Sequence, residues 1–87
     1  MTDIELLTNI VMDQAVMTGK PIIKGTRLTV EFILNLLAHG ATIEEIRAEY
    51  ASLTNDDIYA CLLFATKALE DTAFLPLTAE ADRYIWS

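Results

Sequence analysis

Half of the basic residues of this chain lie in one short stretch, "GKPIIKGTRLTV", which runs from Gly19 to Val30. It holds three of the six basic residues of a protein whose formal net charge is −7. Cations beside a glycine turn that leads into a helix N-terminus can bind a phosphate or a carboxylate, because free backbone N–H groups and the helix dipole attract an anion. The stretch therefore predicts a candidate anion or nucleic-acid site made of Lys20, Lys24, Gly25, Thr26 and Arg27.

The same stretch also has a structural interpretation. It is not a Walker motif, because that motif needs a Lys after its second glycine, whereas Gly25 is followed by Thr26 and Arg27. Arg27 could instead form an internal ion pair with Glu31 or Asp57 and hold the turn against the helices. The sequence favours this second interpretation for Arg27, while Lys20 and Lys24 are expected to face solvent.

The other reactive side chains do not form a catalytic pattern. His39 is the only histidine and Cys61 the only cysteine, whereas a zinc site needs three or four protein ligands. Acids at 44–45 and 56–57 fall at predicted helix N-termini, where the helix dipole already explains them. We therefore expect no metal, no cofactor and no enzymatic activity.

Three helices are predicted in the middle of the chain, at 30–39, 43–50 and from 55 toward 71. Thr29 and Thr54 are suited to N-caps, and Thr42 with Glu45 has the spacing of a capping box. Gly40 is a typical helix stop. The fold class is thus mostly α, a small three- to four-helix homeodomain-like, helix-turn-helix bundle with a short N-terminal strand or hairpin.

We expect a single domain over residues 1–87. Residues 1–28 are predicted to be an extended and turn segment, with one short strand in "NIVMDQAVM" and a tight turn or small hairpin at Lys24 and Gly25. Residues 29–75 form the three-helix core, and 76–87 form a C-terminal tail. The single cysteine, the absence of a secretory signal and the absence of a long apolar run indicate a cytoplasmic protein without membrane contact.

The third predicted helix is apolar on nearly every side in its first half. A chain of 87 residues offers few neighbours to bury such a helix, and 53% of its residues are apolar. We therefore predict a homodimer whose interface is formed by Ile58, Tyr59, Cys61, Leu62, Leu63 and Phe64.

The second and third predicted helices have the outline of a DNA-binding helix-turn-helix. Acids at 56 and 57 would face the phosphate backbone and repel it. If DNA is bound, its contacts should come from Lys20, Lys24 and Arg27 instead. In the tail, Tyr84 and Trp86 either fold back on the core or anchor in a partner protein.

Residues 19–65 closely resemble the bacterial domain-of-unknown-function family 433. The resemblance rests on "GKPIIKGTR", on the helix that ends at Gly40, on the "TIEEI" helix start at Thr42, and on "LTNDDI", which begins at Leu53. It implies a homeodomain-type three-helix module and a VapB-type, antitoxin-like role. Such a protein would bind and neutralise a PIN-like ribonuclease toxin and could repress its own operon, and the resemblance carries over no catalytic residues.

Overall fold

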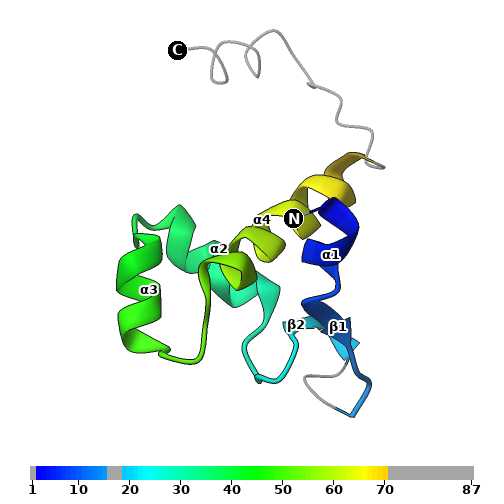
Figure 1. Ribbon diagram of the computed structural model, residues 1–87, viewed down its shortest axis with the longest axis horizontal. Coiled ribbons are helices and arrows are strands. Elements are labelled where there is room, and N and C mark those ends of the chain that lie inside the picture. Colours follow the sequence, from blue (N-terminus) through cyan, green and yellow to red (C-terminus); the bar gives the residue numbers. More distant parts are fainter. Residues whose placement is uncertain (1, 16–18, 71–87) are drawn as a thin grey trace, which may run out of the picture.

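A computed structural model describes residues 2–15 and 19–70 of the chain. In this part the order of elements is α1 (Asp3–Leu7), β1 (Ile10–Met12), β2 (Pro21–Ile23), α2 (Val30–Ala38), α3 (Ile43–Glu49) and α4 (Asn55–Glu70). Figure 1 shows the helices grouped around α4, with the two strands forming a small hairpin beside it. The predicted fold class is confirmed, because the protein is mostly helical with a short N-terminal hairpin.

The N-terminal segment differs from the prediction. Residues predicted to be extended form α1, whose N-cap Thr2 accepts a hydrogen bond from the Glu5 amide at 3.2 Å. Asp3 and Glu5 lie in the first turn, where their charges suit the positive end of the helix dipole. The expectation of an extended chain throughout 1–28 was therefore wrong at α1, although Thr2 and Glu5 already have capping-box spacing in the sequence.

The two strands pair antiparallel, with Ile10 opposite Ile23 and Met12 opposite Pro21. After β2 the chain reverses at Gly25, which has a φ of 80° that other residues rarely adopt. An isolated bridge between Ile22 and Thr29 closes this second reversal. The predicted tight turn at Lys24 and Gly25 is confirmed.

The three central helices begin at the predicted caps. The side chain of Thr29 accepts from the Phe32 amide, Thr42 and Glu45 form a complete capping box, and the Thr54 hydroxyl accepts from the Asp57 amide. The first of these helices ends with His39 as its C-cap, followed by Gly40 at a φ of 98°. The sequence therefore placed α2, α3 and α4 to within one or two residues at each end.

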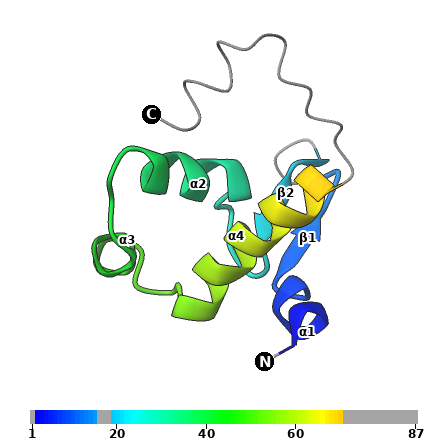
Figure 2. The ribbon, with the colours of Figure 1, turned by 90° about the horizontal axis from the view of Figure 1, so that it is seen from above.

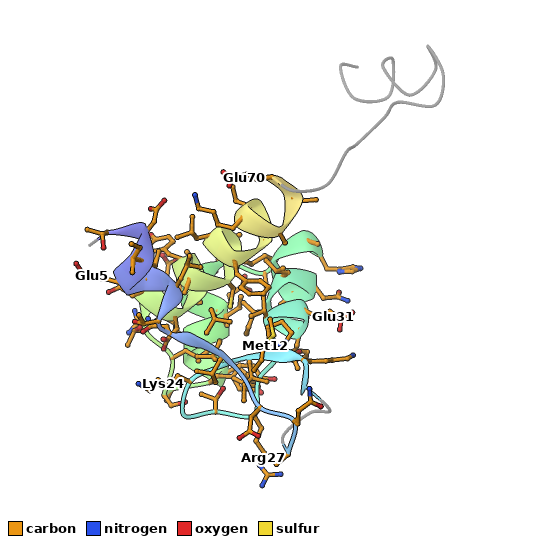
Figure 3. The ribbon with its side chains drawn as sticks, turned by 90° about the vertical axis from the view of Figure 1, so that its right-hand side faces the viewer. Glu5, Met12, Lys24, Arg27, Glu31 and Glu70 are labelled. Atoms are coloured by element: carbon orange, nitrogen blue, oxygen red, sulfur yellow. The ribbon has the colours of Figure 1, made fainter. Side chains whose placement is uncertain are left out.

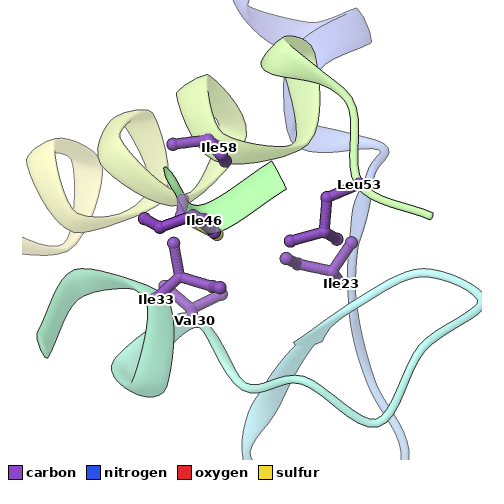
Figure 4. Close-up of a cluster of buried hydrophobic side chains, with 7 residues drawn as sticks. Ile23, Val30, Ile33, Ile46, Leu53 and Ile58 are labelled. Carbon is purple, nitrogen blue, oxygen red and sulfur yellow. The ribbon is translucent and has the colours of Figure 1, made fainter. Parts of the chain in front are cut away.

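The helix α4 packs against α1, α2, α3 and β1, and it lies between α2 on one side and the hairpin on the other (Figure 2). The hydrophobic core gathers on its inner face, and its side chains point toward one another from β2 and the helices (Figure 4). The fully or nearly fully buried members of this core are Ile23, Val30, Ile33, Ile46, Leu53, Ile58 and Cys61. No helix in the part of the chain that the structure describes is long and apolar enough to cross a membrane.

Candidate functional site

The basic site predicted from the sequence lies in the loop between β2 and α2. Thr26 holds this loop in shape, because its hydroxyl donates to the Ile23 carbonyl at 2.8 Å and accepts from the Leu28 amide at 3.0 Å. Gly25 supplies the positive φ at the tip, and a Cβ there would meet no atom within 4 Å. The loop is therefore a hydrogen-bonded turn that projects Lys24 and Arg27 from one end of the protein.

An anion-binding turn directs several unbonded backbone N–H groups at its ligand. In this loop, most of the backbone N–H groups already donate hydrogen bonds within the protein. The Lys24 amide donates to the Asn9 carbonyl at 2.7 Å, and the Thr26 amide donates to the Ile23 carbonyl at 3.0 Å. Within residues 2–15 and 19–70, only the amides of Gly25 and Arg27 in this turn have no acceptor. An anion here would be held mainly by side-chain charge.

The three cations of the segment have different surroundings. Lys20 forms an ion pair with Glu31, with 3.2 Å between Nζ and Oε1. Lys24 and Arg27 are exposed, and neither forms an ion pair with any residue that the structure describes. Figure 3 shows both side chains pointing away from the body of the protein.

The predicted internal ion pair of Arg27 was wrong. Glu31 is taken by Lys20, and the Asp57 carboxylate accepts from the Thr54 amide at 3.0 Å as part of the α4 cap. Lys20 is exposed, as expected, and its ammonium group also pairs with Glu31 of α2. Sequence distance could not distinguish Lys20 from Arg27 as the partner of Glu31, because the direction of each side chain decides it.

The predicted dimer interface on α4 is divided between two faces. Ile58 and Cys61 are 0% exposed within the chain's own core, so their assignment to an interface with a second copy was wrong. Tyr59 and Leu62 remain 46% and 41% exposed. The last two predicted interface residues, Leu63 and Phe64, are half-buried.

A longer apolar row extends from the exposed part of that interface. Tyr59, Leu62 and Leu69 are separated by three and seven residues, which places them along one side of a helix. Leu69 is 67% exposed. We call these three residues the α4 row.

His39 lies at the end of α2, and Cys61 is buried in the core. The His39 ring nitrogen Nδ1 lies 2.8 Å from the Asn35 carbonyl oxygen. Burial raises the pKa of the Cys61 thiol to about 12, and the nearby Asp57 carboxylate adds to the effect. A thiol with so high a pKa is a weak nucleophile at neutral pH, and no group of three metal-ligating side chains occurs among the described residues.

Arg47 was missed by the sequence analysis. Its Nε donates to the Leu53 carbonyl at 3.1 Å and its Nη1 donates to Asn55 Oδ1 at 2.9 Å. It thereby joins α3 to the linker and to the first residue of α4. The only signal in the sequence is a cation in the last turn of a short helix, which helix dipoles favour in any case. The predicted partner-binding residues Tyr84 and Trp86 lie outside the described residues.

Comparison with known proteins identifies the family. The sequence profile of the family described as "protein of unknown function (DUF433)" matches residues 10–65. The chain belongs to the DUF433 family. The match includes the hairpin, the Lys24–Arg27 turn, α2, α3 and the first two-thirds of α4, so these elements constitute the DUF433 domain of this chain.

One solved structure of a DUF433 protein is similar to this chain. It is the crystal structure of a DUF433 member from Anabaena variabilis ATCC 29413 at 2.00 Å resolution, with 26% sequence identity and a TM-score of 0.67. The similarity covers 97% of this chain and 75% of the other. No curated protein matched the chain.

Proposed function

We propose that this DUF433 protein is a non-catalytic, antitoxin-like protein that binds and neutralises a PIN-like ribonuclease. The observation that carries this proposal is the α4 row, Tyr59, Leu62 and Leu69, which is exposed on an otherwise strongly acidic chain. Three large apolar side chains on one side of a helix are a typical feature of a surface that another protein covers. The proposed role is therefore to bind another protein.

Two copies of the chain form the unit in this proposal. The α4 row of one copy packs against that of another through Tyr59 and Leu62, the exposed members of the interface expected from the sequence. Leu62→Asp should convert the dimer to a monomer in analytical ultracentrifugation, because a buried, unpaired carboxylate is costly. Asn35→Asp, which adds the same charge at an exposed position on α2 outside the α4 row, is the control and should remain dimeric. A wild-type protein that stays monomeric at several hundred micromolar would exclude the dimer.

The ribonuclease would contact the tail. The chain continues beyond α4 to Tyr84 and Trp86, and these residue types are preferred anchors at interfaces. A ribonuclease must attract the phosphates of RNA and therefore carries a basic binding face. A chain with a formal net charge of −7 complements such a face.

Co-expression tests this function. The ribonuclease encoded next to this protein should co-purify with it at micromolar concentration, and growth of the host should be rescued. Tyr84→Ala with Trp86→Ala should weaken the complex at least about tenfold, since Tyr and Trp are enriched among the hot-spot residues whose truncation costs about 2 kcal/mol or more. Lys24→Glu, in the turn before α2, is the control and should bind as the wild type does. Failure of the wild-type protein to associate or to rescue growth would reject the proposal.

DNA binding is a second candidate, favoured by Lys24 and Arg27, which are exposed and form no ion pair with the residues that the structure describes. In a helix-turn-helix made by α3 and α4, the recognition helix would begin with Asn55, Asp56 and Asp57. Asn55 already accepts a hydrogen bond from Arg47, and the two acids would repel phosphates. Contact with DNA would therefore come from the turn before α2, one copy from each subunit of the dimer.

A further inference from the structure

An apolar groove of about 400 Å³ lies between β2, α2 and the last two turns of α4. Its principal lining residues are Pro21, Val30, Leu34, Phe64, Ala65 and Leu69. The polar side chain at its edge, Glu31, is already paired with Lys20. The groove therefore offers almost nothing to a polar ligand and is suited to aliphatic and aromatic side chains.

We propose that the chain's own segment 74–77, Phe74-Leu75-Pro76-Leu77, binds in this groove. The helix α4 ends at Glu70, one residue after Leu69, which is part of the groove wall. Only Asp71, Thr72 and Ala73 separate that end from the segment. The first apolar cluster after α4 is thus separated from the groove wall by only a few residues of sequence.

The length of the connection permits this return. The four residues from Glu70 to Phe74 can span up to about 13 to 14 Å when extended. The groove extends back along α4 from Leu69 to Phe64, which is five residues or about 7.5 Å of helix. Pro76 lacks an amide hydrogen and disfavours helical geometry at Leu75, so the segment binds as an extended chain.

Attachment to the same chain favours this occupant over a separate molecule. A linker of three residues gives the segment an effective concentration in the millimolar range, whereas a second copy must first lose its translational and rotational freedom. Phe74, Leu75 and Leu77 also supply three apolar side chains for a groove whose walls are apolar. The groove shares Leu69 with the α4 row, but the inference does not require the proposed function, because the contact between two copies is assigned to Tyr59 and Leu62.

Disulfide trapping in the full-length chain tests it. Ala73→Cys leaves the three apolar side chains intact and is combined with Ala65→Cys in the groove or, as the matched control, with Thr66→Cys. Thr66 is the next residue of α4, is exposed, and is not part of the groove. We expect the intrachain disulfide of the Ala65→Cys pair to form about tenfold faster or more, as expected for a docked segment compared with a merely tethered one. Adding Phe74→Asp and Leu75→Asp should lower that rate to that of the control.

Three results would overturn the inference: equal rates for the two pairs, no disulfide with Ala65→Cys, or disulfides only between chains. The last would assign the groove to a second copy. Ala73→Cys alone controls for Cys61, which is 0% exposed and should not react. Because Ala65→Cys could disturb packing, an NMR measurement on the unmodified protein is independent of it. Nuclear Overhauser contacts between the Phe74 ring and the Leu34 methyl groups are expected at low protein concentration, and their absence would also overturn the inference.

Discussion

Lys20 and Glu31 form an ion pair, with 3.2 Å between Nζ and Oε1, that ties the segment entering β2 to the first turn of α2. Both side chains are more than half exposed, so the pair contributes little to stability. The three cations of the stretch from Gly19 to Val30 therefore differ in their surroundings. Lys20 pairs with Glu31, whereas Lys24 and Arg27 form no ion pair within residues 2–15 and 19–70.

The exposure of Lys24 and Arg27 predicts how the turn before α2 would bind DNA. Lys24→Glu and Arg27→Glu should each weaken binding and reduce the slope of log affinity against log salt by about 1, because each removes a phosphate contact. Lys67→Gln, on α4 and paired with Asp3 and Glu70, should leave the slope unchanged. The measurement is fluorescence anisotropy over a salt series. If the wild-type protein has no affinity even at low salt, the DNA-binding candidate is rejected.

Truncation of a side chain should destabilise the protein strongly on the buried face of α4 and only weakly on its exposed face. Ile58→Ala should lower the free energy of unfolding by about 2 to 5 kcal/mol, because it leaves a cavity in the core. Leu62→Ala, 41% exposed in the single chain, should lower it by less than about 1 kcal/mol when measured at dilute concentration. Urea titration followed by circular dichroism gives both values. Equal losses would mean that the helix is not packed as described.

The two hydrogen bonds of Arg47 predict that its contribution to stability depends on the shape of the guanidinium group as well as on its charge. Arg47→Ala should destabilise the protein by roughly 1 to 2 kcal/mol, because it removes hydrogen bonds to Leu53 and Asn55. Arg47→Lys should restore only part of this loss, since an ammonium group cannot make both bonds as a planar guanidinium does. Arg27→Ala is the matched control and should change stability by less than about 0.5 kcal/mol. Full rescue by Lys would show that charge alone matters.

Cys61 predicts a loss of stability in alkali. Its pKa is raised from 9.0 to about 12 in the folded protein, chiefly by burial. The stabilising contribution of the neutral thiol is therefore complete below pH 9.0 and is lost as the pH rises toward about 12, because the unfolded chain ionises first. A thiol reagent at pH 8 should label the protein rapidly in urea and very slowly without it. Equally rapid labelling of the folded protein would contradict the burial of this side chain.

The sequence predicted the elements whose ends carry strong local signals. Thr29, Thr42 and Thr54 marked the starts of α2, α3 and α4, because a cap is a contact between residues three positions apart. The start of α1 has the same spacing at Thr2, but the branched residues of the strand that follows favour an extended chain.

Long-range relationships could not be predicted in this way. The apolar residues of α4 surround the helix, so only the packed position of α2, α3 and the hairpin decides that Ile58 is buried and Leu62 is exposed. The acceptors of Arg47 are set by the path of the linker between two helices, which periodicity does not describe. The same holds for the pairing of Glu31 with Lys20.

The most direct test of the proposed antitoxin-like role is a titration of a PIN-like ribonuclease encoded by an adjacent gene with this protein, following cleavage of a fluorescent RNA. We expect activity to fall in proportion to the added protein and to reach its minimum at a fixed stoichiometric ratio. The Tyr84→Ala, Trp86→Ala variant should need at least about tenfold more protein for the same inhibition. Ribonuclease activity that stays unchanged at a large excess of the wild-type protein would contradict the proposed role.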